Sequence, residues 1–279
     1  MDYTIDHAIN TAVRGHPLLD SILSNFASWG VTLFGVAAFL LWLLDKPRHP
    51  GVYRRACAAG LSAAAVALLL NQIISHFWHR ARPYEAHPRG VLPLIAGSHD
   101  PSFPSDHATA AFAIAFGVLF VALRAGLLFL AWATLIALSR VLVGVHYPTD
   151  ILASLPVGII AGFICARTLM PMLDRLIALA GRVTDPILER IEASPLIHAS
   201  LGSPHFRSRA AAVIGVVLLT GFAGQMGGPI LDELPLAALA LGALIVLGAS
   251  RLAGLQPPDR RNTAPRQPTG LRPRPGDEA

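Results

Sequence analysis

The sequence predicts an all-α fold, a polytopic membrane helix bundle with a core of five to six helices plus a C-terminal helical extension. Of its 279 residues, 53% are hydrophobic and only 14% are charged, with a mean hydropathy of +0.54. This is too apolar for an ordinary soluble domain of that size. A membrane-spanning helix needs about 20 mostly apolar residues. Five stretches meet this need clearly: 22–44, 57–77, 107–124, 126–145 and 149–169.

The N-terminal stretch differs from the hydrophobic core region, residues 22–170. Ile5, Ile9 and Val13 recur at near-helical spacing, with charged residues between them. Residues 1–21 are therefore predicted to form an amphipathic helix on the outer membrane surface. The first residues are acidic and lack a small-residue cleavage site, so we do not expect a secretory signal peptide.

The C-terminal part of the chain predicts three further segments. An apolar stripe between charged residues makes residues 171–209 a cytoplasmic or interfacial helical segment. Two weaker apolar runs make residues 210–252 an additional transmembrane hairpin. Residues 253–279 are rich in proline and arginine, and we expect them to be a disordered basic cytoplasmic tail.

Positive charge sets the expected orientation, because cytoplasmic loops retain an excess of Lys and Arg. If the 45–56 loop faces the cytoplasm, 17 of the 22 basic residues lie on the cytoplasmic side. Topology and anionic lipid heads then explain the net charge of +5, and no nucleic-acid partner is expected. The five basic residues on the outer side are Arg14, Arg80, Arg82, Arg89 and Arg140.

Neither a metal site nor a cofactor is predicted. Cys57 and Cys165 both fall inside expected spans and indicate neither a disulfide nor a metal cluster. The outer carboxylates, such as Asp100, Asp106 and Asp150, are too few and too scattered for a convincing magnesium site.

Three polar clusters stand at the ends of the predicted spans. They are RARP at 80–83, PSFPSDH at 101–107 and SRVLVGVHYPTD at 139–150. The topology brings all three to the outer face. Ionisable residues at bilayer depth cost about 2.5 to 3.5 kcal/mol each, so they mark functional sites by default. We interpret the three clusters as one phosphate-binding site.

The second cluster predicts a helix N-terminus that faces this site. Pro104 fixes the entry of the chain, Ser105 is a good N-cap, and a helix that begins at Asp106 points unpaired N–H groups outward. Such a terminus binds phosphate. The alternative is that Ser105 only caps a transmembrane helix and that His107 is an interfacial polar residue.

The third cluster predicts a histidine held by a carboxylate. Pro148 suits the first position of a helix, which puts Asp150 in the first turn of that helix. A carboxylate there can hold one ring nitrogen of His146 and leave the other free to attack. The alternative is a first-turn acid that stabilises the helix dipole, beside an interfacial histidine. The other members of the cluster are Ser139, Arg140 and Gly144.

Two arginines of these clusters are suited to bind phosphate. Arg82 and Arg140 carry planar, forked donors that match phosphate oxygens. Surface arginines are usually only solvated, but these two lie on the side of the membrane that the orientation rule disfavours.

Together the clusters resemble the signature of the type 2 phosphatidic acid phosphatase superfamily: K-x6-R-P, P-S-G-H and S-R-x5-H-x3-D. Arg82-Pro83 matches the end of the first motif. Residues 104–107 match the second with Asp for Gly, a variant similar to the bacterial undecaprenyl-diphosphate phosphatase branch. The likeness spans about residues 5–170. The third motif is matched at every fixed position, by Ser139, Arg140, His146 and Asp150.

One position departs from this signature. Ser75 stands seven residues before Arg82, where the family carries Lys. On a helix, residues 75, 79 and 82 share a face. His79, or Arg80 beside it, is therefore a candidate for the missing positive charge.

The resemblance implies a role for each matched residue. His146 would be the nucleophile that forms a phosphohistidine, with Asp150 orienting it. His107 would protonate the leaving group and then act as base for the hydrolytic water. No metal is implied. The candidate substrate-binding residues are Arg82, Arg140, Ser105, Asp106, Pro104, Ser139, Gly144, His79 and Arg80.

The resemblance implies an integral-membrane, metal-independent lipid phosphatase. This enzyme would convert undecaprenyl diphosphate to undecaprenyl phosphate on the outer face of the cytoplasmic membrane, in support of peptidoglycan synthesis. The enzymatic alternative is a phosphatase of phosphatidic acid, phosphatidylglycerol phosphate or diacylglycerol diphosphate. The other alternative is a non-enzymatic transporter or scaffold with a vestigial site. Charges at one membrane edge favour chemistry on a lipid head group. The expected partners are the lipid substrate and the bilayer, and a homo-oligomer is left open.

Overall fold

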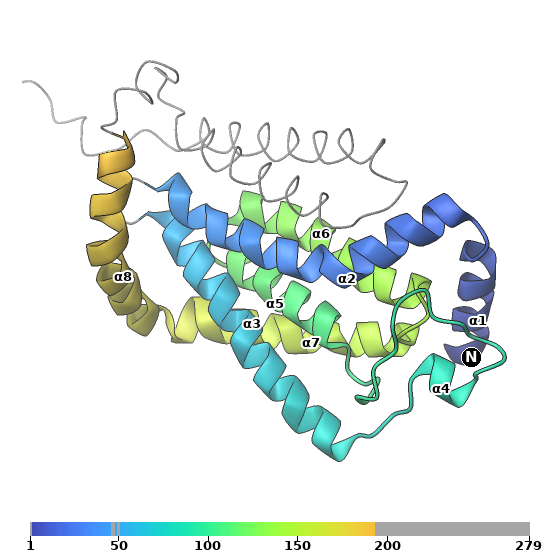
Figure 1. Cartoon of the computed structure of the whole chain (residues 1–279). Helices are drawn as coiled ribbons and strands as arrows, with labels where there is room; N and C mark the ends of the chain where they lie inside the picture. The colour runs from blue at the N-terminus through green and yellow to red at the C-terminus, as the bar shows by residue number, and fades with distance from the viewer. Residues whose placement is uncertain (1, 46–47, 49–50, 193–279) are drawn as a thin grey trace, which may run out of the picture.

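The computed structural model describes residues 2–45, 48 and 51–192, and within them the chain is a bundle of α-helices without a strand (Figure 1). The all-α prediction is confirmed for this part of the chain. The elements are α1 (Asp2–Val13), α2 (Pro17–Leu40), the 3-10 helix η1 (Leu41–Leu44), α3 (Val52–Phe77), α4 (Pro83–Ala86), α5 (Asp106–Leu119), α6 (Leu123–Leu142), α7 (Pro148–Phe163), the π-helical segment η2 (Ile164–Thr168) and α8 (Met170–Glu192).

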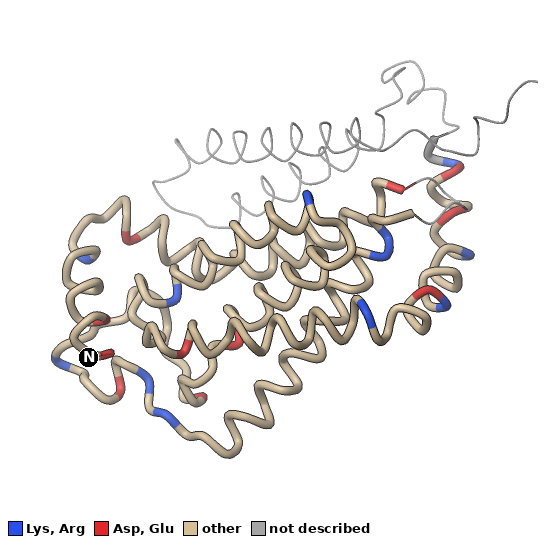
Figure 2. The backbone as a smooth tube through the Cα atoms, turned by 180° about the vertical axis from the view of Figure 1, so that it is seen from behind, with Lys and Arg blue, Asp and Glu red and all other residues tan. Residues whose placement is uncertain are grey.

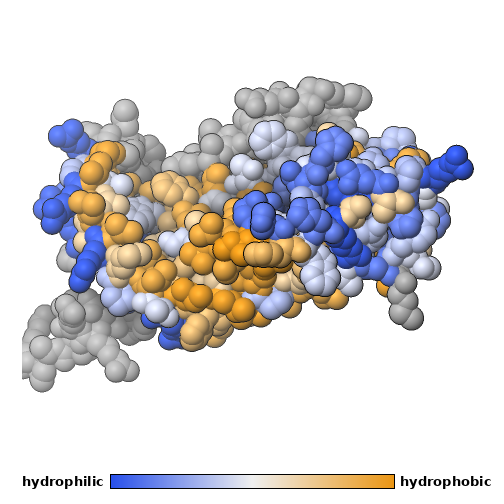
Figure 3. Space-filling model, turned by 90° about the horizontal axis from the view of Figure 1, so that it is seen from below, coloured by the Kyte–Doolittle hydropathy of each residue, from blue (hydrophilic) through white to orange (hydrophobic). Residues whose placement is uncertain are grey.

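Four helices of the described chain are long and apolar enough to cross a membrane. Each overlaps one of the predicted spans. Charged residues gather toward the two ends of the bundle (Figure 2), and a band of hydrophobic side chains crosses the middle of the face shown in Figure 3. These features are those of a multi-pass membrane protein. The four spans are Pro17–Leu44, Val52–Phe77, Leu123–Leu142 and Pro148–Thr168.

The remaining predicted span, 107–124, is a shorter helix in the structure. α5 has 14 residues, about 21 Å at 1.5 Å per residue, which is less than the ~30 Å hydrocarbon core. It ends at Leu119 because the chain turns sharply into α6: a Cβ added to Gly126 would lie 2.1 Å from the Leu119 Cα. α5 runs through the centre of the bundle, among α2, α3, α6 and α7 (Figure 1).

Small residues let the neighbouring helices approach α5 closely. A Cβ on Gly117 would lie 2.8 Å from the Gly60 Cα of α3, and one on Gly162 of α7 would lie 2.8 Å from the Gly117 backbone nitrogen. Membrane helices associate through such small-residue contacts, because hydrocarbon supplies no hydrophobic force between them. This packing holds the C-terminal part of α5 between α3 and α7.

The N-terminal helix is shorter than the predicted segment 1–21. α1 ends at Val13, after which Gly15 has a left-handed φ of +94° and Pro17 begins α2. Its buried residues are the polar Asp6 and Asn10, whereas the apolar Ile5 is 49% exposed. The polar face is turned inward because it makes hydrogen bonds to the loop of residues 78–105, here named the outer loop after its predicted side of the membrane.

At the other end of the bundle, α8 lies across the ends of the long helices (Figure 1). It accounts for the first part of the predicted segment 171–209. The predicted hairpin 210–252 and the predicted tail 253–279 lie outside the described residues.

A buried ion pair attaches α8 to α3. Arg54 donates from Nη2 to Oδ1 of Asp185 over 2.6 Å, with side-chain exposures of 1% and 8%. The Arg54 guanidinium also stacks 4.8 Å over the Trp42 ring, and Asp185 accepts a 2.7 Å bond from the Arg48 backbone N–H. Removing one partner of such a pair leaves an uncompensated buried charge.

We therefore expect Arg54→Met to lower the free energy of unfolding by about 3 kcal/mol or more. The exposed pair Arg55–Asp174, also joined over 2.6 Å, provides the matched control. Arg55→Met should cost about 1 kcal/mol or less, because water screens exposed pairs. Unfolding of both variants in detergent, followed by circular dichroism, measures the difference. Equal losses would show that Arg54–Asp185 does not anchor α8.

Candidate active site

His146 lies in the turn between α6 and α7 and is 2% exposed. Gly144, two residues before it, has a left-handed φ of +73°, which favours glycine. A Cβ at this position would also lie 2.8 Å from Nδ2 of Asn10 in α1. Gly144 therefore allows the turn that points His146 into the bundle and leaves room for α1.

The contacts of His146 fix its tautomer. Nδ1 lies 2.8 Å from the backbone carbonyl oxygen of Ser102, which can only accept a hydrogen bond. Nδ1 therefore carries the ring hydrogen, and Nε2 carries the lone pair. Nη1 of Arg82, a donor, lies 3.3 Å from Nε2. The nitrogen that could act as a nucleophile thus faces a guanidinium group.

Asp150 holds the other side of this arrangement and is fully buried. Its Oδ2 accepts a 2.5 Å bond from the Ser102 hydroxyl and a 2.9 Å bond from the Tyr147 backbone N–H. The same oxygen lies 3.7 Å from Nδ1 of His146. The structure therefore places Asp150 beside the predicted ring nitrogen, while Nδ1 donates its direct hydrogen bond to the Ser102 carbonyl.

Ser102 is a site residue that the sequence analysis missed. It is fully buried, and its backbone N–H donates a 2.8 Å bond to the carbonyl of Arg80. Its hydroxyl donates to Asp150 and its carbonyl accepts from His146, so Ser102 connects the two side chains. The only sequence signal was its place inside the PSFPSDH cluster, because an extended loop residue belongs to no helical pattern.

The surroundings of His146 favour the neutral ring. Burial lowers the pKa of His146 below its ordinary value, and the positive charges of Arg82 and Arg140 lower it further. Asp150 opposes this shift. The net lowering keeps the Nε2 lone pair free at neutral pH, as a nucleophile requires.

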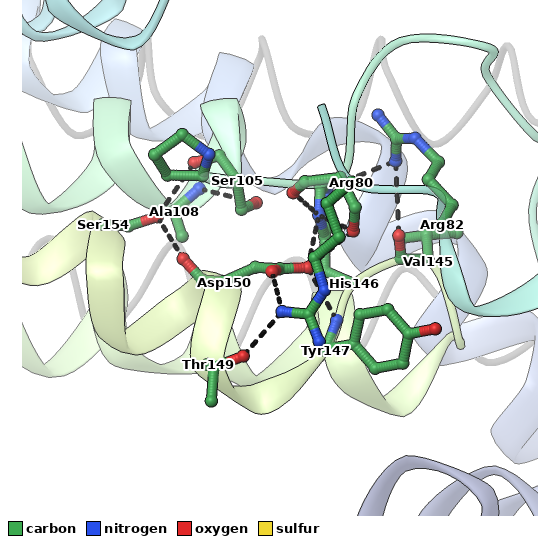
Figure 4. Close-up of polar contacts among 12 residues, drawn as sticks. Arg80, Arg82, Ser105, Ala108, Val145, His146, Tyr147, Thr149, Asp150 and Ser154 are labelled. Atoms are coloured by element: carbon green, nitrogen blue, oxygen red, sulfur yellow. Dashed lines mark hydrogen bonds and ion pairs between the residues drawn. The ribbon is translucent and has the colours of Figure 1, made fainter. Parts of the chain in front are cut away.

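The N-terminus of α5 begins as predicted, at Asp106 with Ser105 as the N-cap. The Ser105 hydroxyl accepts a bond from the Ala108 backbone N–H, and its carbonyl accepts a 3.1 Å bond from Ser154 of α7 (Figure 4). These contacts fix the free N–H groups of α5 relative to the helix that carries Asp150.

Asn71 of α3 holds the same helix end from the other side, and sequence reasoning did not find it. This buried amide donates to the Pro104 carbonyl over 3.3 Å and to Oδ1 of Asp106 over 2.7 Å. Its own oxygen accepts a 3.3 Å bond from Thr109. The structure thus gives Asp106, the residue that replaces the glycine of the family motif, a protein partner.

Arg140 and Arg82 lie close to His107 and His146. Arg140, Arg82 and His146 each affect the charge state of the His107 ring. Arg140 donates from Nη1 to the Ala27 carbonyl over 2.7 Å, but its buried Nε has no partner among the described residues. In that part of the chain neither arginine pairs with a carboxylate. Two neighbouring cations with an unused buried donor suit an anion such as phosphate.

The remaining candidates lie elsewhere. The Ser139 hydroxyl donates 2.7 Å to the Ile136 carbonyl of its own helix. The prediction that residues 75, 79 and 82 share a helix face is wrong, because α3 ends at Phe77 and residues 78–82 are not helical. His79 is exposed, and Arg80 is bound to Asp150 and Asp2.

Comparison with known proteins identifies this arrangement. The model of the PAP2 superfamily matches residues 55–171, which include all three polar clusters. The undecaprenyl-diphosphatase BcrC of Bacillus subtilis is 32% identical over 198 residues, covering 70% of this chain and 97% of that protein. The chain belongs to the PAP2 superfamily.

Other PAP2-related proteins show lower coverage. The putative undecaprenyl-diphosphatase YbjG of Escherichia coli is 31% identical over 153 residues, covering 54% of this chain and 74% of that protein. The lipid A 1-phosphatase of Rhizobium etli is 38% identical over 154 residues, covering 50% of this chain and 66% of that protein. The crystal structure of Aquifex aeolicus LpxE, 28% identical, covers 59% of this chain and 93% of its own, with a TM-score of 0.47.

From the contacts of Ser102 we expect Ser102→Ala to lower kcat for phosphate release by about tenfold with little change in KM, because it removes the hydroxyl that holds Asp150. Ser98→Ala in the same loop is the control, since its hydroxyl bonds only the exposed Asp100. Steady-state assays of both variants with a lipid phosphate provide the measurement. A kcat for Ser102→Ala equal to that for Ser98→Ala would contradict this role.

Proposed function

We propose that this PAP2 protein hydrolyses undecaprenyl diphosphate to undecaprenyl phosphate and phosphate on the outer face of the cytoplasmic membrane. The observation that carries the proposal is the buried His146, whose Nε2 lies 3.3 Å from Arg82. Similarity to the Bacillus subtilis undecaprenyl-diphosphatase over 97% of that protein supports the choice of lipid.

The proposed reaction has two steps. Nε2 of His146 attacks the terminal phosphorus, the bond from that phosphorus to the bridging oxygen breaks, and undecaprenyl phosphate leaves with a proton from His107. Water then gives a proton to His107, and its oxygen attacks the phosphohistidine. Phosphate leaves, and the lone pair returns to Nε2.

Cationic and dipolar groups stabilise the charge that develops on phosphorus. Arg82 and Arg140 provide N–H donors, and the N-terminus of α5 adds backbone N–H groups held by the Ser105 cap. In this mechanism the arginines take the electrophilic role that a metal ion has in other phosphatases, so the reaction needs no metal.

The membrane face is proposed from the distribution of charge. The orientation rule puts the arginine-rich α2–α3 loop and α8 on the cytoplasmic side. The turn between α6 and α7, which carries His146, lies at the opposite end of the bundle, near α1 (Figure 1). The substrate of His146 is then a head group in the outer leaflet.

A second candidate is hydrolysis of a different lipid phosphate. The 38% identity with the Rhizobium etli lipid A 1-phosphatase favours it. The histidine mechanism applies equally to such a substrate, because its steps involve only the phosphoryl group and its leaving oxygen.

The proposal is tested by phosphate release from purified protein in detergent with excess EDTA. Undecaprenyl diphosphate should be preferred over phosphatidic acid, phosphatidylglycerol phosphate and lipid A. His146→Ala should lose activity by at least ~10³-fold, as removal of a covalent nucleophile does, and His107→Ala should also be strongly impaired.

His99→Ala is the matched control, because this histidine of the outer loop is fully exposed. Its activity should equal that of the wild type. Activity that survives in His146→Ala, or that EDTA abolishes, would overturn the mechanism. A preference for another lipid would overturn the substrate and leave the mechanism in place.

A further inference from the structure

Arg80 connects the catalytic region to the N-terminal helix. Its Nη1 donates to Oδ1 of Asp150 and to the Thr149 hydroxyl, each over 2.7 Å, and its Nη2 donates to Oδ2 of Asp2 over 2.6 Å. The guanidinium stacks 3.9 Å above the Tyr147 ring (Figure 4). Three of its five N–H donors are thus used on Thr149, Asp150 and Asp2.

The helix α1 is attached to the outer loop along its length. Asn10 exchanges two 3.1 Å bonds with the backbone of Leu92, and His7 contacts the Gly90 carbonyl over 2.5 Å. At the start of the helix, Asp2 also accepts from the Thr149 hydroxyl and backbone N–H. These bonds turn the polar face of α1 toward the site.

We propose that Asp2 and Arg80 are positioning residues of the phosphatase reaction, and that α1 is therefore part of the active site. The inference rests on the function proposed above. A continuous chain of contacts runs from Asp2 through Arg80, Asp150 and Ser102 to His146. Each residue in it fixes the next.

The role of Arg80 follows from the burial of Asp150. Oδ2 of this carboxylate is held by Ser102 and the Tyr147 backbone, while Oδ1 has Arg80 as its partner. Without Arg80, a buried anionic oxygen would lose its charge-assisted bond, and the carboxylate could rotate away from Ser102. Asp2 in turn keeps the 27%-exposed Arg80 side chain in this conformation.

Charge provides a signature that a purely structural role would not produce. The Arg80 cation offsets part of the Asp150 anion, so its removal should raise the pKa of His146. Loss of the Asp2 anion should lower it. Since the nucleophile must be neutral, the acidic limb of kcat/KM moves to higher pH in the first case and to lower pH in the second. The charged or titratable groups that otherwise act near His146 are Arg82 from the outer loop, Arg140 from α6, His107 from α5 and Asp150 from α7.

Asp6 on α1 also titrates near neutral pH, so its contribution to the pH profiles has to be separated from that of His146. It is fully buried, and neither carboxylate oxygen has a partner among the described residues. Burial raises the pKa of Asp6 to about 7, and the charges of Asp2 and Asp150 contribute to this shift. The pH profiles are therefore compared in the wild-type background and again with Asp6→Asn.

The experiment measures kcat, KM and pH profiles for Arg80→Gln, Arg80→Lys, Asp2→Asn and the double variant Asp2→Asn/Arg80→Gln. Arg80→Gln should lower kcat about tenfold, and Arg80→Lys should recover part of it. The double variant should be no slower than Arg80→Gln alone, because both act through one chain. Arg89→Gln, an exposed arginine of the same loop, should match the wild type.

Binding of orthovanadate, a phosphate-like oxyanion, is measured in parallel. Active wild type with unchanged kcat and pH profiles in the variants overturns this inference alone. If no lipid is hydrolysed but vanadate binds, weaker binding by Arg80→Gln supports the inference, and unchanged binding overturns it. Wild type that neither hydrolyses lipid nor binds vanadate overturns the proposed function and this inference together.

Discussion

The hydrogen bond from Nδ1 of His146 to the Ser102 carbonyl determines what the rest of the site can do. A carbonyl cannot donate, so the ring hydrogen stays on Nδ1 and the lone pair stays on Nε2. The bond also requires the outer loop to lie against the α6–α7 turn. Arg80 and Arg82 belong to that loop, so their positions on either side of His146 depend on the same contact.

The central position of α5 sets the other half of the geometry. Its contacts at Gly117 and Gly162 bring backbones together, and that closeness leaves little freedom to slide or rotate. The Ser105 cap and the Asn71 amide then fix the first turn. α5 is too short to cross the membrane alone, and these contacts hold its N-terminus and the adjacent His107 at a fixed position along the bundle.

Local patterns predicted the spans and the α5 cap because these depend on residues near one another in sequence. They could not predict that Ser102 would contact His146, 44 residues away, or that Asn71 would hold Asp106. The proposed common face for Arg82 failed because α3 ends before it. Apolar periodicity predicted a helix at α1 but could not predict that Asn10 would be buried against Leu92, 82 residues away.

The site is polarised across one imidazole ring. The carboxylate of Asp150 lies on the Nδ1 side, with Arg80 and Asp2 beyond it, while Arg82 lies on the Nε2 side. Neither Arg82 nor Arg140 has a carboxylate partner among the described residues. An anion is attracted to the second side and repelled from the first. The carboxylates of Asp150 and Asp2 are both paired with Arg80, and neither forms an ion pair with Arg82 or Arg140 among the described residues. In the proposed mechanism Arg80 therefore acts on the carboxylate of Asp150, while Arg82 and Arg140 bind the phosphate.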